Sequence, residues 1–175
     1  KYENANDIYN LIVNTGKEFQ LSHCGAHTMD IMRMESGFLH WGHDISPEEN
    51  QFQAKLNFTI SFKKNFDFIG KKKLLENKKQ KLDRRIIMLL LKDNDPGNPL
   101  LLHEEPIYLN NTIIGKTTSG NYSFNYNKNI SFGYIESDLK DEDLHEKNLY
   151  IEIEKLKYPA ELLLKPLKQN NYKNI

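Results

Sequence analysis

MRMESGFLHWGHDISPEE, residues 32–49, is the stretch on which the interpretation of the whole chain depends. Arg33 and Glu35 stand two positions apart in it, behind an apolar-faced segment. After a glycine break comes a close set of aromatic and charged residues, which are His40, Trp41, His43 and Asp44. Charged side chains are rarely buried without a partner, so core packing alone does not explain such a set. We therefore treat this stretch as the first candidate for a functional site.

The residue types in this stretch each leave two interpretations open. Residues two apart on a helix do not face each other, so Arg33 and Glu35 should reach separate partners. Either they join neighbouring segments through salt links, or they shape a ligand pocket, since Arg offers a planar fork and Glu accepts hydrogen bonds. Trp41 could stack on a flat ring or plug a domain junction. His43 and Asp44 could form a hydrogen-bonded dyad, although a cap on the turn is the simpler role.

The histidines and the single cysteine could also serve metal binding or nucleophilic catalysis. Cys24 and His27, followed by His40 and His43, have spacings that a small zinc site could use. One thiolate with three imidazoles is an uncommon structural set, however, and the intervening segment reads as a helix with its own core positions. Nucleophilic catalysis by Cys24 would need a base and an orienting acid, and no acid is close in sequence. We therefore expect neither a metal site nor a catalytic residue in this chain.

Composition indicates a globular protein without an obvious polyanion-binding field. The 175 residues suffice for one ordinary domain or two small ones, with 38% hydrophobic and 27% charged residues and a formal net charge of zero. Lys and Arg number ten between residues 63 and 85, against three acidic residues, while residues 136–154 carry eight acidic residues and two Lys. Such asymmetry favours local steering over nucleic-acid binding. No apolar run approaches the roughly 20 residues that span a bilayer.

Several features bear on where the chain works and whether it is whole. A single cysteine excludes an internal disulfide and fits a reducing compartment. The polar start KYENAND is not a signal peptide, and a first residue that is Lys rather than Met hints at a fragment. We expect a cytoplasmic protein, or one of the mitochondrial matrix if the source is eukaryotic, with no membrane and no nucleic acid among its partners.

The first 82 residues read as helices, links and one strand. Residues 4–15 carry an apolar stripe and predict a surface helix that packs this stripe inward. Residues 26–35 predict a second helix that ends at Gly37, with its Met residues filling the core. Residues 55–62, KLNFTISF, alternate and predict a half-buried strand. The lysine-rich residues 70–81 predict a third helix, most simply a solvated face, and we place a domain boundary near Leu82.

From Arg84 onward the pattern changes to short apolar runs separated by turn signals. RRIIMLLLK predicts a buried strand, NDPGNP a loop, and Asn110-Asn111 the turn of a hairpin, because Asn tolerates positive φ. Later runs, NISFGYIE, LYIEIEK and YPAELLLK, supply further strands. GKTTSG at residues 115–120 lacks the P-loop pattern and reads as a strand bend. Five or six strands in about 80 residues are typical of a small barrel or sandwich.

Three motifs carry a resemblance to a known family: RMESGFLHWGHDI with SPEE, DFIGKKKLL at residues 67–75, and IIGKTTSG at residues 113–120. Together they resemble the C-terminal half of the aminomethyltransferases, the glycine cleavage T-proteins. They are more similar to the folate-binding half of dimethylglycine and sarcosine dehydrogenases, in which Arg-x-Glu-Lys-Gly leads into Trp-Gly-x-Asp. The resemblance runs from about Tyr2 to Pro166. Ser36 stands where those dehydrogenases usually carry Lys, and Met29 stands where T-proteins carry a folate-contacting arginine.

The resemblance implies a fold, a cofactor and a place in a larger enzyme. The fold would be α+β: residues 1–82 close a folate-binding domain, and residues 83–175 form a small antiparallel β-barrel. The family transfers a one-carbon unit to tetrahydrofolate, giving methylenetetrahydrofolate, and in the dehydrogenases an N-terminal domain carries FAD. The implied folate-binding or pocket-shaping residues are Arg33, Glu35, Trp41 and His43. The assisting aspartate and the flavin would belong to an N-terminal part, so this chain alone should be inactive.

The resemblance also leaves alternatives and implies partners. Some relatives regulate a phosphatase, so a non-catalytic regulatory or assembly subunit is the second hypothesis, and a small zinc-binding module is the third. The basic helix around Lys71–Lys81 could attract the polyglutamate tail of a folate. When this chain is separated from an N-terminal half or a partner subunit, residues 1–62 should expose an apolar face. Such a face predicts a homodimer or poor solubility.

Overall fold

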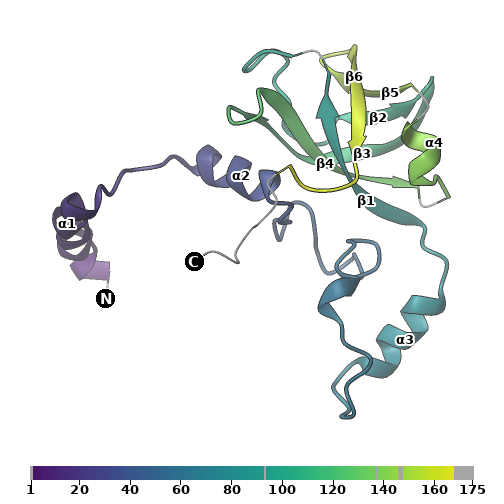
Figure 1. Cartoon of the computed structure of the whole chain (residues 1–175), viewed down its shortest axis with the longest axis horizontal. Helices are drawn as coiled ribbons and strands as arrows, with labels where there is room; N and C mark the ends of the chain where they lie inside the picture. Colours follow the sequence, from purple (N-terminus) through teal and green to yellow (C-terminus); the bar gives the residue numbers. More distant parts are fainter. Residues whose placement is uncertain (1, 93, 137, 146–147, 168–175) are drawn as a thin grey trace.

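The computed structural model describes residues 2–92, 94–136, 138–145 and 148–167, and it consists of a closed β-barrel with helical segments outside it (Figure 1). Four α-helices are described, α1 (Ala5–Gly16), α2 (Ala26–Glu35), α3 (Lys71–Lys79) and α4 (Asp141–His145). The six strands are β1 (Arg84–Leu91), β2 (Pro106–Leu109), β3 (Thr112–Ser123), β4 (Lys128–Glu136), β5 (Leu149–Ile153) and β6 (Leu156–Leu163). Short 3₁₀ turns lie at Tyr2–Asn4, Lys17–Phe19 and Asn57–Thr59. This arrangement confirms the expected α+β class with an antiparallel barrel.

The barrel follows the order β1-β4-β3-β2-β5-β6, and every pair of neighbouring strands is antiparallel. The predicted hairpin forms between β2 and β3, with Asn110 at a φ of 56° in its turn. Closure removes the exposed edges that an open sheet of this size would leave. Its interior holds large aliphatic side chains that are almost fully buried, including Leu89, Ile107 and Ile151.

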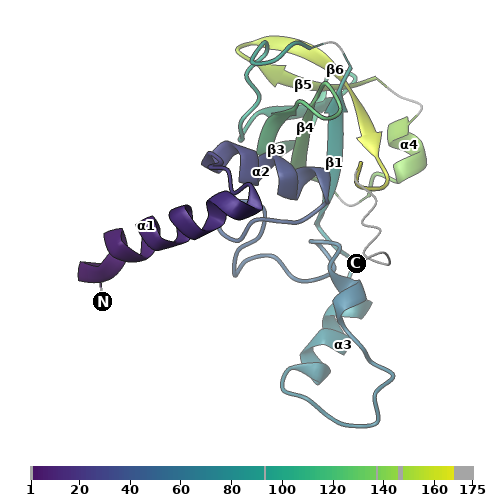
Figure 2. The ribbon, with the colours of Figure 1, turned by 60° about the vertical axis from the view of Figure 1, so that its left-hand side comes forward.

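A second apolar layer lies on the outer face of β1 and β4, where α2 packs. Met34 of α2 is fully buried there against a group that includes Met88, Ile130 and Phe132. Since β1 and β4 are covered on both faces, nearly all of their residues are buried instead of being buried and exposed in alternation. The helix α2 is thus fixed to the barrel, and Figure 2 shows it lying in front of the barrel strands, where it contacts β3 and β4.

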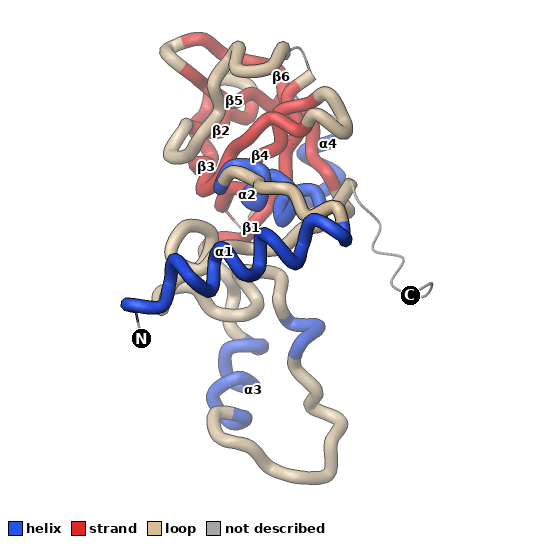
Figure 3. The backbone as a smooth tube through the Cα atoms, turned by 90° about the vertical axis from the view of Figure 1, so that its left-hand side faces the viewer, coloured by secondary structure: helices blue, strands red, loops and turns tan. Residues whose placement is uncertain are grey.

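The helices α1 and α3 stand away from the barrel. Figure 3 shows α1 and α3 as separate helices outside the barrel, and Figures 1 and 2 agree that α1 projects outward on an extended link. The helices at residues 26–35 and 70–81 were predicted, with differences of one or two residues at the ends of α3. None of the described helices has the length and apolar character needed to cross a membrane.

Three expectations about residues 1–62 are wrong. The stripe of α1 does not pack inward, because Ile8, Leu11 and Ile12 are 52%, 66% and 55% exposed. Of the Met residues on α2, only Met34 fills the core, since Met29 and Met32 lie on the side of the helix turned away from the barrel. Residues 55–62 form turns and a 3₁₀ segment instead of a strand. An alternating pattern yields a strand only where a neighbouring strand can satisfy its backbone groups, and the described residues supply none here.

Candidate functional site

Arg33, in the last turn of α2, lies at the centre of a polar junction between the helix, the following turn and the barrel. Its guanidinium donates to Asp30 at 2.8 Å, to the carbonyl of Phe38 at 3.2 Å and to the hydroxyl of Ser119 at 2.7 Å. It also pairs with Asp44 at 2.5 Å and lies over the ring of Phe132. Three chain segments therefore share one cation, as the salt-link interpretation of Arg33 predicted.

Asp44 is the anionic partner of this junction, and its side chain is completely buried. Its Oδ2 accepts from Arg33 and from the backbone N–H of His40, at 2.8 Å. Its Oδ1 accepts from the hydroxyls of Thr118 at 2.5 Å and Ser119 at 2.8 Å. Asp44 thus caps the turn that begins at His40, as expected, and joins it to β3 as well.

Neighbouring residues of a strand normally point to opposite faces, so two successive hydroxyls on one carboxylate need an explanation. The register of β3 against β4 shifts between Thr117 and Ser119, which makes Thr118 the extra residue of a β-bulge. A bulge re-aims side chains, and here it brings Thr118 and Ser119 to the same oxygen of Asp44. The GKTTSG segment is therefore a strand bend, as predicted from its composition, with an anchoring role that its composition did not reveal.

Glu35 forms a second junction between α2 and the end of β3. It is only 3% exposed, and its carboxylate accepts from Ser123 at 2.5 Å and from the amide of Asn125 at 3.0 Å and 3.2 Å. As expected for residues two apart, Arg33 and Glu35 reach different partners. Both partners lie in this chain, so neither side chain projects freely into a cavity.

Trp41 and His43 lie on the outer side of the turn that Asp44 holds. Trp41 is 64% exposed and forms an isolated bridge with Ile45, while Gly42 between the two site residues adopts a φ of 92° that favours glycine. The ring of His43 lies 4.6 Å from that of His40 and 6.4 Å from that of His103, measured between centroids. The turn therefore presents an indole and a row of imidazoles to its surroundings.

The described structure does not assemble the zinc site that the spacing of Cys24 and the histidines suggested. Within residues 2–92, 94–136, 138–145 and 148–167, no group of three His, Cys, Asp or Glu side chains is placed to hold a metal ion. Cys24 is exposed on the extended link before α2, while His40 and His43 lie on the turn after that helix. The structure does not bring the proposed zinc ligands together.

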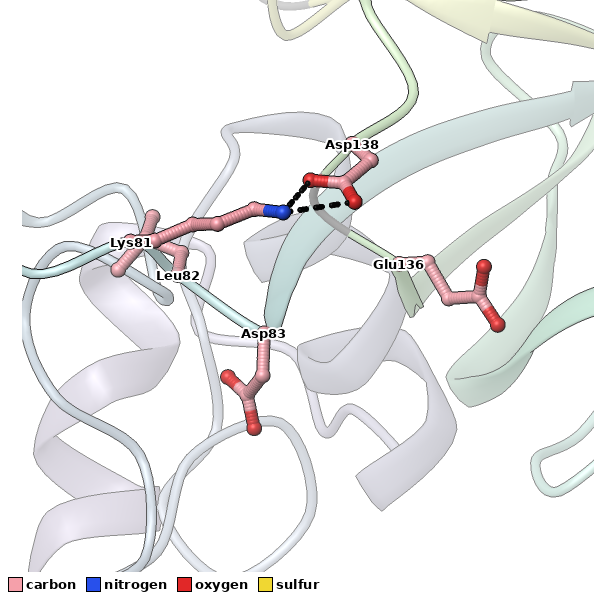
Figure 4. A pocket seen from close by; sticks show the side chains of 5 residues that line it. All are labelled: Lys81, Leu82, Asp83, Glu136 and Asp138. Atoms are coloured by element: carbon pink, nitrogen blue, oxygen red, sulfur yellow. Dashed lines mark hydrogen bonds and ion pairs between the residues drawn. The ribbon is translucent and has the colours of Figure 1, made fainter.

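A cavity lies elsewhere, at the start of the barrel. It is open and about 450 Å³ in volume, and it is lined by Lys81, Leu82, Asp83, Glu136 and Asp138. Figure 4 shows the amine of Lys81 bound to Asp138, at 2.9 Å, while the carboxylates of Asp83 and Glu136 point in other directions. A hydrogen bond from Gln53 holds the pKa of Asp83 below its ordinary value.

A buried hydroxyl lies under the loop that follows the turn. Tyr134 of β4 is 8% exposed, and burial raises the pKa of its phenol, with the nearby carboxylate of Glu49 acting in the same direction. Arg84 pairs with Glu49 at 2.8 Å and lies over the Tyr134 ring. These contacts fix residues 46–53 on the barrel next to the Arg33 and Asp44 junction.

Sequence reasoning missed the residues of the barrel that complete the junction. Thr118, Ser119, Ser123 and Asn125 are separated from α2 by more than 80 positions, and no local pattern links them to it. The one available signal was the run of three hydroxyl residues, Thr117 to Ser119, directly before Gly120. His103 gave no signal, because it lies in a loop between two strands.

Comparison with protein families finds two models that match in succession. The GCVT N-terminal domain matches residues 1–64, and the glycine cleavage T-protein C-terminal barrel domain matches residues 84–168. The second match covers all six strands of the barrel.

Individual relatives extend the similarity along nearly the whole chain. It is 34% identical over 94% of its length to mitochondrial dimethylglycine dehydrogenase of Homo sapiens, and it spans 18% of that protein. It is 29% identical over 79% of its length to the mitochondrial pyruvate dehydrogenase phosphatase regulatory subunit of Mus musculus, spanning 16% of it. The crystal structure of glycine cleavage system aminomethyltransferase T from Bartonella henselae has a similar fold, with a TM-score of 0.67 and 21% identity over 79% of this chain and 37% of that one.

Proposed function

The chain belongs to the glycine cleavage T-protein, or aminomethyltransferase, family, and on that premise we propose that it is the C-terminal portion of a tetrahydrofolate-dependent one-carbon transfer enzyme. We propose further that the enzyme is of the dimethylglycine or sarcosine dehydrogenase type and yields methylenetetrahydrofolate. Support for this branch comes from the similarity to dimethylglycine dehydrogenase, which extends over 94% of the chain. In a eukaryotic source we expect the mitochondrial matrix, and in a bacterium the cytoplasm.

The observation that carries the proposal is the turn 40–44, whose outer side is exposed while its inner side is anchored. A pterin or aminobenzoyl ring needs a flat stacking surface and hydrogen-bonding groups, and Trp41 with His43 offers both. Arg33 and Glu35 are engaged within the chain, so their role would be to shape the pocket by fixing α2. Tetrahydrofolate, when bound, would supply the nitrogens that accept the one-carbon unit.

The chain provides one wall of such a site and depends on a larger polypeptide for the rest. It spans 18% of the human relative, and the exposed stripe of α1 and the unpaired residues 55–62 are surfaces that further protein could cover. Our proposal divides the chain into residues 1–82, closing the folate-binding domain, and residues 83–175, the barrel domain. Catalytic groups and FAD would come from an upstream part of the same enzyme or from a partner subunit.

The first test is the size of the native polypeptide in source cells, detected with an antibody against this chain. A band several times 20.6 kDa is expected, and that polypeptide should then bind tetrahydrofolate with an affinity that Trp41→Ala lowers. Asp138→Asn is the matched control, because Asp138 contacts Lys81 far from the turn. If the purified native polypeptide did not bind tetrahydrofolate, the proposal would be wrong.

A second candidate is a non-catalytic regulatory subunit of the same fold, favoured by the similarity to the phosphatase regulatory subunit. This reading predicts that the native polypeptide co-purifies with an enzyme whose rate it changes, and that it lacks amine dehydrogenase activity. Turnover of dimethylglycine or sarcosine by the native polypeptide would exclude it in favour of the first candidate.

A further inference from the structure

We infer that Asp44 is the positioning residue of the proposed folate wall: its buried carboxylate holds Trp41 and the neighbouring imidazoles in place by linking their turn to the bulge of β3. The inference rests on the proposed function for its biological meaning. The contacts that carry it stand independently of any ligand.

The carboxylate of Asp44 joins three segments of the chain. The side chain of Asp44 has no solvent exposure, and it accepts four hydrogen bonds from three segments, α2, the turn and β3. An ionised carboxylate is the one side chain that accepts this many bonds without presenting a donor of its own. An amide in its place would turn an N–H toward a guanidinium or a hydroxyl.

Apart from Asp44, the turn is held together by its own backbone. Backbone bonds close it locally: the N–H of Asp44 donates to the carbonyl of His40 at 2.9 Å, and the N–H of Gly42 donates to the carbonyl of Ile45 at 2.8 Å. These bonds keep the turn folded on itself, but they do not tie it to the barrel. Arg33 and the two hydroxyls of Thr118 and Ser119 tie it to the barrel only through Asp44.

The aromatic residues of the turn are exposed. Trp41, His40 and His43 lie on its outer side and have little packing of their own to hold them. His103 reaches them from the loop after β1, which places a residue of the barrel beside a residue of the turn. The spacing between these rings, and hence the shape of the wall, depends on how firmly the turn is held to β3.

Glu35 offers a matched comparison for separating positioning from stability. It is also a buried carboxylate that joins α2 to β3, but its partners Ser123 and Asn125 lie away from the turn. Asp44→Asn and Glu35→Gln each remove one buried negative charge with almost no change in volume. Only the first should alter the surroundings of the tryptophan.

The experiment uses Trp41 as its own probe, because it is the single tryptophan of the chain. The native polypeptide, or the 175-residue chain, is labelled with 5-fluorotryptophan, and its ¹⁹F resonance is recorded at a temperature where far-UV circular dichroism shows each variant folded. If the native polypeptide holds further tryptophans, the resonance of Trp41 is assigned by its loss in Trp41→Phe. Asp44→Asn should move this resonance toward the solvent-exposed shift and change its width, whereas Glu35→Gln should leave it unchanged.

An unchanged resonance in folded Asp44→Asn, or equal changes in both variants, would overturn the inference. If Asp44→Asn does not fold, Ser119→Ala and Thr118→Val each remove one donor to Asp44 and take its place in the comparison. Tetrahydrofolate is then titrated separately. If the Trp41 resonance does not move in these variants, the positioning role is refuted. If the unsubstituted protein does not bind tetrahydrofolate, the proposed function is refuted, and the result on the positioning role still stands.

Discussion

Removing the cation of the junction tests whether the buried ion pair holds α2 to the barrel. Arg33→Met keeps the aliphatic length of the side chain but leaves Asp44 buried without its counter-charge. Removing one partner of a buried pair costs about 3–5 kcal/mol. Three other donors still reach the carboxylate, so the lower end, ~3 kcal/mol, is expected. For a chain of this length that lowers Tm by roughly 6–12 °C.

The assay is urea unfolding combined with a double-mutant cycle. Asp44→Asn alone should also destabilise, but the double variant should lose less than the sum of the two, with a coupling of about 0.5–3 kcal/mol. Lys81→Met is the matched control, because Lys81 and Asp138 form a pair that is 77% and 69% exposed and should contribute about 0–1 kcal/mol. If Arg33→Met cost no more than the control, or if the two losses simply added, the buried pair would not be the tie that we describe.

Three further predictions concern the barrel and one concerns α1. Leu89→Ala should lower the free energy of unfolding in urea by about 2–5 kcal/mol, and a loss below ~1 kcal/mol would contradict a packed interior. Gly115→Ala would place a methyl group against the carbonyl of Tyr134, so β3 and β4 must separate and Tm must fall; an unchanged Tm would refute the register. The pKa of Tyr134 is raised on folding, so its contribution to stability is complete below the unfolded value of about 10 and is lost as pH rises above it. As pH rises from 9 to about 11.5, the free energy of unfolding should therefore fall less for Tyr134→Phe than for the parent protein, as measured in parallel urea titrations. Equal dependence of the two free energies on pH would argue against a buried phenol. Replacing both Leu11 and Ile12 by Ser should change stability by less than ~0.5 kcal/mol while reducing self-association in sedimentation velocity, because both side chains are exposed.

The barrel could be predicted from the sequence because its signals are local. Each strand is an apolar run bounded by turn residues, and the Asn110-Asn111 turn fixes which two of them form a hairpin. The order of the strands around the barrel could not be predicted in this way. The pairing of β1 with both β4 and β6 joins residues that are 40 or more positions apart, and nothing within either run specifies its neighbour.

The site was predictable in its parts but not in its connections. The density of charge around Arg33 and Glu35 indicated that both need partners, and the structure supplies them. It could not indicate that these partners are hydroxyls and an amide of β3, since small polar residues in a strand usually face solvent. The bulge at Thr118 decides this outcome, and it results from strand pairing that only the folded barrel defines.

Two of the three errors in the N-terminal half have a common physical origin. Two patterns, the apolar stripe of α1 and the alternation of residues 55–62, each predict an apolar face. Such a face is buried only where a second surface packs against it. The barrel already covers its own core and uses its outer β1 and β4 face for α2, so it offers no second surface to either segment. A helix with an exposed apolar stripe and an alternating segment without a strand partner gain little stability in this chain. Both patterns therefore make physical sense only if further protein covers them, which is what our assignment of residues 1–82 to a larger folate-binding domain requires.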